Sequence, residues 1–462
     1  MLEKSVVTEL RNITGPAHLS VSPEDLVAYS YDATRREAQP WAVARPATAE
    51  EISRILALAN RERFPVIPRG AGTGMSGGAV PVLGGLVLSL ERMNRILEID
   101  EENFIAVAEP GVVTGDLQNA VEARGLFYPP DPASHRFCTL GGNVAECAGG
   151  LRAVKYGVTK DYVLGLEVVL PTGAIIRTGG RTLKGVAGYD LTKLMVGSEG
   201  TLGVATEIVL KLLPLPESVR TVSAFFPDVD SAARAASKII ASRILPRALE
   251  FVDQAALRAV EAYLNRDLSH GAAAMLLVEV DGPQDSTARE IQLIEELLTR
   301  AKAVRIVRAD TEAEREQLWK ARRSISPALY SLKPKKINED IVVPRSRIPD
   351  ILRVIGYIAE KHRLLIVNFG HAGDGNIHTN ILIDEADAPR AEIAVKEIFE
   401  AVLRMQGSIS GEHGIGLSKA AYLPMELGPD ALAAMKRIKD ALDPNHILNP
   451  GKIFASAPPS LT

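Results

Sequence analysis

The sequence predicts a two-part α+β protein, and three observations carry this prediction. Short β-type runs alternate with glycine loops up to about residue 211, and few helical patterns interrupt them. Two prolines in LLPLPE, residues 212–217, end the last of these strands and mark a boundary. Beyond it, amphipathic helical segments alternate with buried apolar strands. This texture is typical of helices on one face of a mostly antiparallel sheet.

Helical patterns can be placed in chain order. The first follows a Thr-Ala-Glu-Glu start and covers Thr48–Asn60. In the second part we expect four helices, at Asp228–Ala241, Thr287–Ala303, Pro389–Met405 and Pro429–Leu442. Buried strands are expected at AAMLLVEVDG, IVVP and RLLIVNFGHAG, and the segment ILNPGKIF has strand and turn character. The last residues, ASAPPSLT, are expected to be disordered.

Composition excludes several classes of protein. A length of 462 residues suggests two to four domains of about 100–200 residues each. The formal net charge of −4 argues against a general nucleic-acid binder. The apolar stretches, such as Ala272–Val278, are far shorter than the roughly 18–20 residues of a membrane span, and no signal peptide is visible. We therefore expect a cytoplasmic protein.

The chain contains only two cysteines, Cys138 and Cys147. This number excludes a disulfide scaffold, a four-cysteine zinc site and a ferredoxin-type cluster. We interpret both as small residues packed in a loop.

Three glycine-rich loops stand out in the first part. Glycines expose backbone N–H groups and permit positive φ, so PRGAGTGMSGGAVP at Pro68–Pro81 can wrap a pyrophosphate. Its Gly72-x-Gly74-x-x-Gly77 spacing matches a dinucleotide fingerprint, but GAVPVLGG leaves no room for the crossover helix that a Rossmann unit needs. Further polar, glycine-rich runs follow at 129–157 and 185–207. Three such loops at strand ends would surround an extended ligand.

These loops, PRGAGTGMSGG, PDPASHRFCTLGGNVAECAGG and GYDLTKLMVGSEGTLG, resemble the flavin-binding domain of the vanillyl-alcohol-oxidase superfamily over roughly Ala38–Leu213. The resemblance implies FAD. Several members tether the flavin through a histidine where this chain has Thr73, so we expect non-covalent FAD. The residues assigned to the cofactor are Pro68, Arg69, Gly70, Ala71, Gly72, Thr73, Gly74, Pro130, Asp131, Ser134, Thr139, Gly141, Gly142, Asn143, Ala145, Gly157, Glu199, Gly200, Gly203, Val204 and Asn449.

The second part concentrates histidines in two short motifs, HAGDGNIH and GEHG. His371 and His378 lie seven residues apart across a Gly-Asp-Gly turn, which can bring both imidazoles to one point. Glu412 adds a carboxylate and His413 an adjacent imidazole. Two histidines with one carboxylate leave coordination positions open, as a catalytic divalent metal requires.

HAGDGNIH, GEHGIG and LNPGKIF also resemble the C-terminal half of FAD-linked D-2-hydroxy-acid dehydrogenases, a group with D-lactate dehydrogenase, D-2-hydroxyglutarate dehydrogenase and the flavin-bearing subunit of glycolate oxidase. In that family the residues matching His371, His378 and Glu412 bind zinc or another divalent ion, with manganese and iron as the other candidates, and the residue matching His413 acts on substrate. The segment WKARRSISP carries the carboxylate-binding role over to Arg322 and places Ser326 beside it.

Two further substrate contacts follow from the same resemblance. In the family a lysine of the next strand contributes to substrate binding. Here PKKINEDIVVP offers Lys335 and Lys336; we assign Lys336, although the match to the family does not decide between the two. Asn380 matches a position that touches substrate. The resemblance thus implies FAD- and metal-dependent oxidation of a D-2-hydroxy acid such as D-lactate, glycolate or D-2-hydroxyglutarate, with hydride passing to flavin N5 and His413 and Arg322 as the catalytic pair.

Alternatives remain at this level. The same fold serves alkyl-glycerone-phosphate (ether-lipid) synthase, and the chain can also be an auxiliary flavin subunit of a glycolate-oxidase-like complex. We expect electrons to leave to a quinone, a cytochrome, an electron-transfer flavoprotein or an iron–sulfur subunit, which can hold the protein at the inner membrane. A homodimer is also considered. The expected division is a helical segment at 1–37, the FAD-binding domain at 38–215, and at 216–455 a substrate- and metal-binding cap domain with a C-terminal tail.

Overall fold

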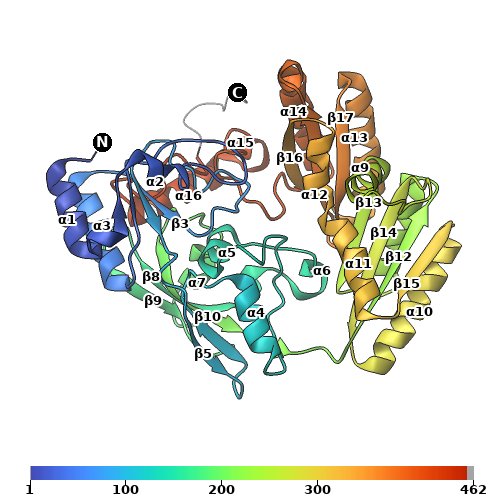
Figure 1. Ribbon diagram of the computed structural model, residues 1–462, viewed down its shortest axis with the longest axis horizontal. Coiled ribbons are helices and arrows are strands. Elements are labelled where there is room, and N and C mark those ends of the chain that lie inside the picture. The colour runs from blue at the N-terminus through green and yellow to red at the C-terminus, as the bar shows by residue number, and fades with distance from the viewer. Residues whose placement is uncertain (1, 455–462) are drawn as a thin grey trace. The chain divides into compact units, whose positions relative to one another are not determined.

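The computed structural model describes residues 2–454 and divides into two compact units (Figure 1). The segment expected to be disordered, residues 455–462, lies outside the described residues. No helix between residues 2 and 454 has both the length and the apolar character needed to cross a membrane. Of the described chain, unit 1 takes residues 2–149, 158–215 and 412–454, and unit 2 takes 150–157 and 216–411.

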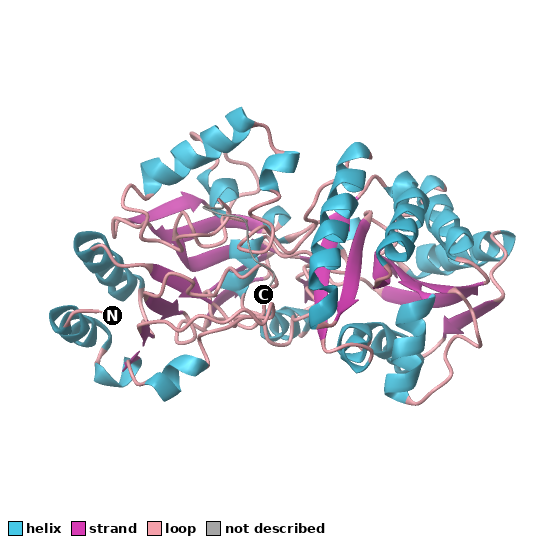
Figure 2. Ribbon diagram, turned by 90° about the horizontal axis from the view of Figure 1, so that it is seen from above, coloured by secondary structure: helices cyan, strands magenta, loops and turns pink. Residues whose placement is uncertain are grey.

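Unit 1 contains three small sheets with helices around them (Figure 2). One has the order β1-β2-β4-β3, in which β2, β4 and β3 run parallel, and one is the antiparallel sheet β5-β6-β10-β8-β9. In the third, β11 pairs with β7. The elements are α1 (Lys4–Thr14), β1 (Leu19–Ser20), α2 (Pro23–Val27), β2 (Ala42–Ala44), α3 (Ala49–Glu62), β3 (Val66–Arg69), β4 (Leu86–Ser89), β5 (Ile96–Asp100), β6 (Ile105–Ala108), α4 (Thr114–Glu122), β7 (Leu126–Phe127), α5 (Leu140–Glu146), β8 (Val163–Val169), β9 (Ile175–Gly179), α7 (Leu191–Met195), β10 (Val204–Lys211), β11 (Leu213–Pro214), α15 (Leu423–Glu426) and α16 (Pro429–Leu442).

Local sequence signals place the first of these elements. Thr48 caps α3 by accepting the backbone N–H of Glu51 at 3.2 Å, and the helix ends where Arg63 adopts φ +58°. The face of α3 that carries Ile52 and Ile55 is fully buried against the parallel sheet. Between the parallel strands β3 and β4 the chain forms loops and turns without a helix, so the rejection of a Rossmann crossover is confirmed.

The C-terminal segment belongs to unit 1, which corrects the expectation that residues 216–455 form one domain. Buried Lys439 of α16 anchors it by donating to Thr201 O at 2.7 Å and Leu448 O at 2.9 Å and by pairing with Asp443 at 2.5 Å. Leu448 forms a single parallel bridge with Val66, so ILNPGKIF contains turns and one bridge rather than a strand. Helix α16 begins and ends as predicted.

Unit 2 is built on one antiparallel sheet of seven strands in the order β15-β12-β14-β13-β17-β18-β16. Its elements are α6 (Ala153–Tyr156), β12 (Ser218–Phe226), α8 (Val229–Ala241), β13 (Ala248–Asp253), α9 (Gln254–Leu264), β14 (Ala274–Gly282), α10 (Gln284–Arg300), β15 (Arg305–Ala309), α11 (Glu312–Arg323), α12 (Ile325–Ala328), β16 (Lys335–Val342), α13 (Ile348–His362), β17 (Leu365–His371), β18 (Asn376–Ile383) and α14 (Ala388–Arg404). The expected helices are all present, although α10 begins at Gln284, three residues before the predicted start.

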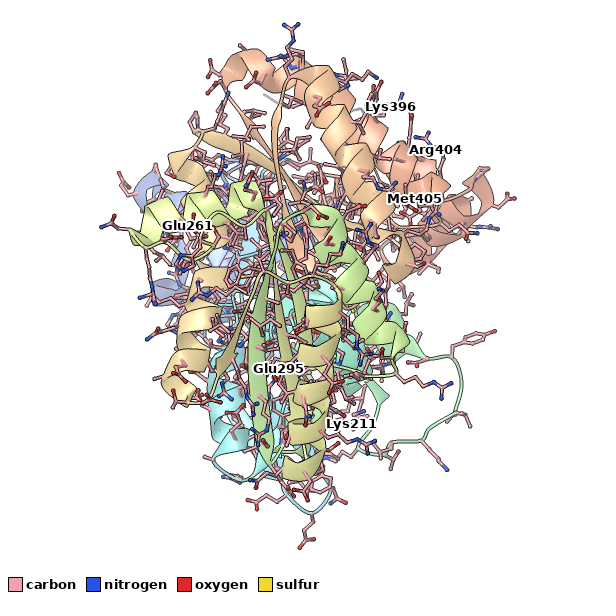
Figure 3. The ribbon with its side chains drawn as sticks, turned by 90° about the vertical axis from the view of Figure 1, so that its right-hand side faces the viewer. Lys211, Glu261, Glu295, Lys396, Arg404 and Met405 are labelled. Atoms are coloured by element: carbon pink, nitrogen blue, oxygen red, sulfur yellow. The ribbon has the colours of Figure 1, made fainter. Side chains whose placement is uncertain are left out.

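Helices cover both faces of this sheet, whereas the sequence predicted helices on one face. Helices α8, α10, α13 and α14 pack on one side, and α9, α11 and α12 on the other. Figure 3 labels Glu261 on α9 and Glu295 on α10, one helix from each side. The reason is visible in the central strands: β14 is buried at eight consecutive positions and β18 at all eight, so neither face of the sheet can be left to water.

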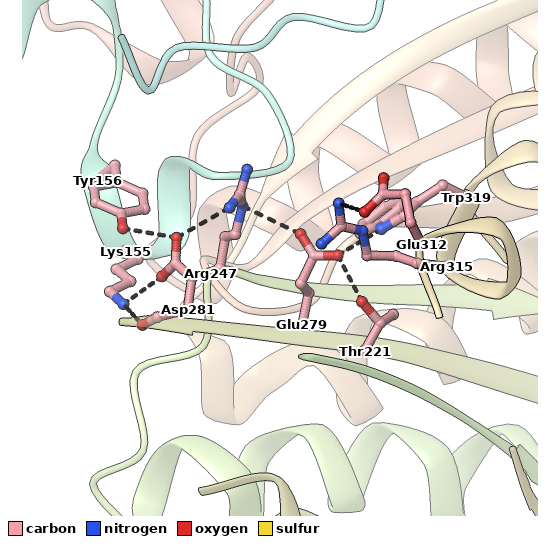
Figure 4. Close-up of polar contacts among 9 residues, drawn as sticks. All are labelled: Lys155, Tyr156, Thr221, Arg247, Glu279, Asp281, Glu312, Arg315 and Trp319. Carbon is pink, nitrogen blue, oxygen red and sulfur yellow. Dashed lines mark hydrogen bonds and ion pairs between the residues drawn. The ribbon is translucent and has the colours of Figure 1, made fainter. Parts of the chain in front are cut away.

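A chain of buried charges crosses one face of the sheet (Figure 4). Asp281 on β14 pairs with Lys155 of α6 at 2.5 Å, accepts the Tyr156 hydroxyl at 2.8 Å, and contacts Arg247 at 3.2 Å. Arg247 also pairs with Glu279 at 3.1 Å. The short helix α6 is thereby tied to the central strand through one carboxylate.

The other end of this series of charged side chains reaches helix α11. Glu279 accepts the indole N–H of Trp319 and the hydroxyl of Thr221, both at 2.7 Å. Trp319 lies on α11, three residues before Arg322, so the charge chain helps to fix the helix that presents this arginine.

We expect the substitution Asp281→Asn to lower the free energy of unfolding by about 3 kcal/mol or more, because removing one partner of a buried ion pair leaves the others uncompensated. Denaturant unfolding measures the change. The control is Asp310→Asn, at an exposed carboxylate paired with Arg308, which should change it by less than about 1 kcal/mol. Equal effects of the two substitutions would contradict the structural role of Asp281.

Candidate active site

Unit 1 contains a cavity of about 250 Å³ that lies among the three glycine loops. Pro130 and Asp131 do not line it, and Gly157 belongs to unit 2. The other residues assigned to the cofactor all line the cavity, namely Pro68, Arg69, Gly70, Ala71, Gly72, Thr73, Gly74, Ser134, Thr139, Gly141, Gly142, Asn143, Ala145, Glu199, Gly200, Gly203, Val204 and Asn449.

The glycines of this cavity do two different things. A Cβ on Gly70 would meet the Thr139 hydroxyl at 2.4 Å, so the first loop can approach the N-terminus of α5 only without a side chain. Added Cβ atoms on Gly74 and Gly142 would come no closer than 3.8 and 3.4 Å to other atoms. Side chains there would therefore enter the cavity itself. The bare backbone and its N–H groups fit an extended, phosphate-bearing cofactor such as FAD.

Arg69 lines the cavity, but its guanidinium is committed elsewhere. It donates to the carbonyls of Tyr31 at 2.8 Å and Ala28 at 3.3 Å and lies over the ring of Tyr29. The side chain therefore fastens the N-terminal segment to the first loop. Only the backbone of Arg69 remains for the pyrophosphate that the loop Pro68–Pro81 is expected to wrap.

Glu412 and His413 also line this cavity, and a buried carboxylate fixes their loop. Glu199 accepts the backbone N–H groups of Ile415 at 2.8 Å and Gly416 at 2.7 Å. A Cβ on Gly414 would lie 3.0 Å from Glu199 Oε1, so only glycine fits beside that carboxylate. Sequence reasoning assigned Glu199 to the cofactor and missed this anchoring role.

A second acid, the half-buried Glu146 at the end of α5, is also close to Gly414, since a Cβ there would lie 2.7 Å from Glu146 Oε2. Burial, together with the nearby charges of Glu199 and Asp32, holds the pKa of Glu146 well above its usual value. Burial likewise raises the pKa of Glu199, against the opposing effect of its two backbone donors. Both acids therefore lie close to Gly414, and Glu199 binds the His413 loop directly. Glu146 had no assignment from the sequence.

In unit 2 the two predicted ligand histidines come together on adjacent strands. His371 ends β17, His378 lies on β18, and their Nε2 atoms are 3.3 Å apart with the rings nearly perpendicular. His371 Nδ1 lies 2.7 Å from Glu250 Oε1. Because a carboxylate only accepts, Nδ1 carries a proton, and Nε2, which faces His378, has a free lone pair when the ring is neutral. A carboxylate behind one ring nitrogen is a common support for a metal-binding histidine.

Glu250 also binds Arg322, which brings the predicted carboxylate-binding residue to the same place. The guanidinium donates to Glu250 Oε2 from Nε at 2.8 Å and Nη2 at 2.7 Å, and it stacks over Phe369 at 4.8 Å. Burial alone would raise the pKa of Glu250, but His371 and Arg322 outweigh it and hold that pKa below its usual value. The signal missed in the sequence was an acid within the apolar run ALEFVD.

The remaining predicted residues of unit 2 lie on α12, β16 and β18. Lys336 donates to the Ser326 hydroxyl at 2.6 Å, whereas Lys335 is largely exposed beside Glu385. Of the two lysines, Lys336 is therefore the better candidate for a substrate contact. Asn380 is fully buried on β18, two positions from His378 and on the same face of the sheet. Its Oδ1 makes no hydrogen bond within residues 2–454.

Comparison with known proteins follows the same two parts. A family described as "FAD binding domain" matches residues 40–179, and one described as "FAD linked oxidases, C-terminal domain" matches residues 215–453. The chain is 49% identical to glycolate oxidase subunit GlcD of Bacillus subtilis over 98% of both chains. It is 36% identical to D-lactate dehydrogenase of Anaerostipes hadrus over 90% of both.

Solved structures show the same fold at lower identity. p-Cresol methylhydroxylase aligns over 98% of this chain and 96% of its own, with a TM-score of 0.82 and 18% identity. An alkyldihydroxyacetonephosphate synthase aligns over 97% of this chain and 86% of its own, with a TM-score of 0.75 and 21% identity. These neighbours confirm a flavin-binding fold of the vanillyl-alcohol-oxidase type.

A buried lysine of unit 1 predicts a measurable pH dependence. Lys452 is 3% exposed and donates to Val80 O at 2.6 Å. Burial lowers its pKa to about 8, although the negative charges of Asp32 and Glu199 act to raise it. The unfolded chain keeps this proton up to about pH 10.4. The cost of burying the charged amine is therefore present below about pH 8 and is relieved above it.

We expect the parent to gain about 2 kcal/mol of unfolding free energy over Lys452→Met between about pH 7.5 and pH 10. Denaturant unfolding of both proteins at the two pH values measures this gain. Parallel pH curves for the two would show that Lys452 titrates normally.

Proposed function

Because the chain belongs to the FAD-linked oxidases, in the group of glycolate oxidase subunit GlcD and D-lactate dehydrogenase, we propose that it oxidises a D-2-hydroxy acid to the 2-oxo acid with the help of a divalent metal. FAD binding and hydroxy-acid oxidation follow from the family. The metal and the residue roles are the proposal. The observation that carries it is the single carboxylate of Glu250 holding both His371 and Arg322.

Arg322 binds the substrate carboxylate in this proposal. Its Nε and Nη2 are held by Glu250, and no hydrogen bond of its Nη1 occurs among the described residues. A planar guanidinium fixed at one edge offers a defined donor to a second carboxylate. Ser326 and Lys336, which bond each other, add a hydroxyl and a positive charge from α12 and β16. Asn380 contributes an amide.

His371, His378 and Glu412 each offer one atom to a metal. The fit rests on the two Nε2 atoms that face each other at 3.3 Å and on the tautomer that Glu250 imposes. Glu412 follows directly on Gly411, whose backbone N–H is fixed by the Asp340 carboxylate at 2.9 Å. A bound divalent ion lowers the pKa of a coordinated hydroxyl group. Imidazole and carboxylate suit zinc, and also manganese or iron.

His413 takes the hydroxyl proton. FAD, when bound, accepts the hydride from Cα at N5. The proton on the substrate oxygen must leave in the same reaction, and a neutral imidazole is a suitable acceptor. Glu199 holds the backbone after Gly414 and Glu146 lies close to Gly414, so the ring of His413 is presented from a fixed loop at the cavity of unit 1. These acids act by positioning and do not touch the substrate in this proposal.

The relative in Bacillus subtilis is named as a subunit of glycolate oxidase. By that likeness we infer that this chain also transfers its electrons to a partner, either a further subunit or a quinone, cytochrome or electron-transfer flavoprotein. Such a partner can hold it at a membrane surface. The likeness to alkyldihydroxyacetonephosphate synthase extends to the fold, while the facing histidines favour the hydroxy-acid reaction.

The direct test mixes the purified protein with D-lactate or glycolate without oxygen. We expect bleaching of the flavin absorbance, because the hydride reduces FAD, and no bleaching with L-lactate. Acid denaturation should release all yellow colour, because Thr73 offers no ring nitrogen to tether the flavin. Flavin retained on the washed precipitate would contradict non-covalent binding. An unreduced flavin with every D-2-hydroxy acid would overturn the proposed activity.

Metal removal tests the ligand set. Chelation should abolish substrate-dependent flavin reduction while FAD stays bound, and zinc or manganese should restore it. His378→Ala should lose metal in elemental analysis, because it removes one of three ligands. His446→Ala, at an exposed histidine of unit 1, is the control and should keep the metal. Full activity in metal-stripped protein would remove the ion from the mechanism.

Two substitutions separate binding from chemistry. Arg322→Ala should raise KM about 10- to 100-fold, since a charge-assisted contact is lost, whereas the exposed neighbour Arg323→Ala should not. His413→Ala should slow flavin reduction at saturating substrate about 100- to 10,000-fold. Stopped-flow absorbance measures both. Reduction of the His413→Ala variant at near-parental speed would place the base elsewhere.

A further inference from the structure

A second cavity, of about 260 Å³, lies within unit 2. It covers the sheet face of β12, β13, β14 and β15 beneath helices α9 and α11. Twelve of its twenty lining residues are apolar, among them Phe225, Val252, Leu257, Val260, Leu277 and Leu318. The others are polar or charged: Ser223, Arg266, Asp267, Arg305, Arg308, Glu314, Gln317 and Arg322. Nothing in the proposed reaction so far uses this space.

The strand register shows where the cavity lies relative to the proposed metal ligands. Across adjacent strands Ser223 pairs with Leu277, Leu277 with Glu250, and Glu250 with His371, so the four side chains share one row on one face. The cavity occupies the Ser223–Leu277 end of this row, and His371 lies at the opposite end. Arg322, bonded to Glu250, stands between the two and lines the cavity.

This order matches the groups on a 2-hydroxy acid. Its Cα carries the hydroxyl, the carboxylate and a side chain. In this arrangement the hydroxyl lies at the histidine end of the row and the carboxylate on Arg322. The side chain then points along the row in the opposite direction from the histidines, over Val252 and Leu277 and into the cavity. The walls there are suited to hydrocarbon, because apolar area leaves water on binding.

Water is a poor occupant of the inner part of this cavity. The Ser223 hydroxyl is fully buried in its floor and makes no hydrogen bond within residues 2–454. An ordered buried water needs two to four polar partners, and the two cross-strand neighbours of Ser223, Leu277 and Val307, are apolar. Displacing weakly held water by an apolar group gains affinity.

We propose that this cavity receives the side chain of the substrate, and that the protein acts on D-2-hydroxy acids with a medium-length apolar chain in preference to D-lactate or glycolate. The inference rests on the proposed function, in which Arg322 holds the carboxylate. A water molecule occupies about 30 Å³, so 260 Å³ holds about eight groups of that size. A chain of six to eight carbons is therefore the expected optimum.

The far end of the cavity opens between exposed residues. Asp267 is engaged by His270 and Glu314 by the capping box at Thr311, whereas Arg266 makes no side-chain ion pair among the described residues. A chain longer than the cavity can leave at this end into solvent. Affinity should accordingly stop rising once the cavity is full, rather than fall sharply.

The first experiment measures kcat/KM of the holoenzyme, with a dye acceptor, for D-lactate, D-2-hydroxybutyrate, D-2-hydroxyhexanoate and D-2-hydroxyoctanoate. We expect a rise of up to about fourfold per added CH2. A flat series, or one that falls from D-lactate onward, overturns the proposal while leaving the proposed oxidation intact.

A matched pair of variants tests whether the substrate side chain binds in this cavity. Val307 lines the cavity from the edge strand β15, and Val304, 64% exposed, precedes the same strand without lining it. Val307→Phe should lower the ratio of D-2-hydroxyoctanoate to D-lactate efficiency at least tenfold, and Val304→Phe should leave the ratio unchanged. Equal ratios in both variants overturn the placement.

Binding of octanoate separates this proposal from failure of the reaction itself. Calorimetry on the parent should show saturable binding that D-lactate displaces, weakened by Val307→Phe and by Arg322→Gln. If no hydroxy acid is oxidised but octanoate binds in this way, the proposed function fails, while the cavity is still a binding site for a hydrocarbon chain. Octanoate that binds without competing with D-lactate identifies a separate fatty-acid site and overturns the proposal, as does the absence of binding.

Discussion

The buried carboxylate of Glu250 is the constraint on which the rest of unit 2 depends. It is fully buried, and burial alone would favour its neutral form. Arg322 and His371 keep it ionised, and in return it fixes the guanidinium at one edge and the histidine in one tautomer. A single acid on a central strand therefore sets the directions of two side chains from a helix and from the neighbouring strand. Removing it would take away the hydrogen bonds that fix the guanidinium of Arg322 and the Nδ1 of His371.

In unit 1, buried charged side chains hold the glycine loops in place. Its glycine loops leave a cavity by omitting side chains, and such loops need support from elsewhere. Arg69 supplies it at one end by holding the carbonyls of Ala28 and Tyr31, and Glu199 supplies it at another by holding the N–H groups after Gly414. Buried charges here bind backbone rather than ligand. The consequence is a cavity whose bare backbone is held in place from behind.

The seven-stranded sheet explains why one domain can present both a polar site and an apolar cavity on one face. Antiparallel register places residues of four strands in one row, and chemistry can change along that row from histidines through an arginine to hydrocarbon. Helices on both faces bury the central strands β14 and β18, so a charged residue on them needs a partner. The charge chain from Asp281 to Trp319 shows how far this requirement extends.

The sequence by itself determined the family, the flavin fold, the helix positions and the identity of the candidate ligands, because glycine loops, caps and histidine spacing are local signals. Three matters were decided only by tertiary structure: that residues 412–454 return to unit 1, that helices cover both faces of the sheet, and that Glu250 joins His371 to Arg322. Each depends on contacts between residues far apart in the chain. An acid inside ALEFVD carries no local mark of its partners, since 121 positions separate Glu250 from His371. Only the pairing of β13 with β17 brings them together.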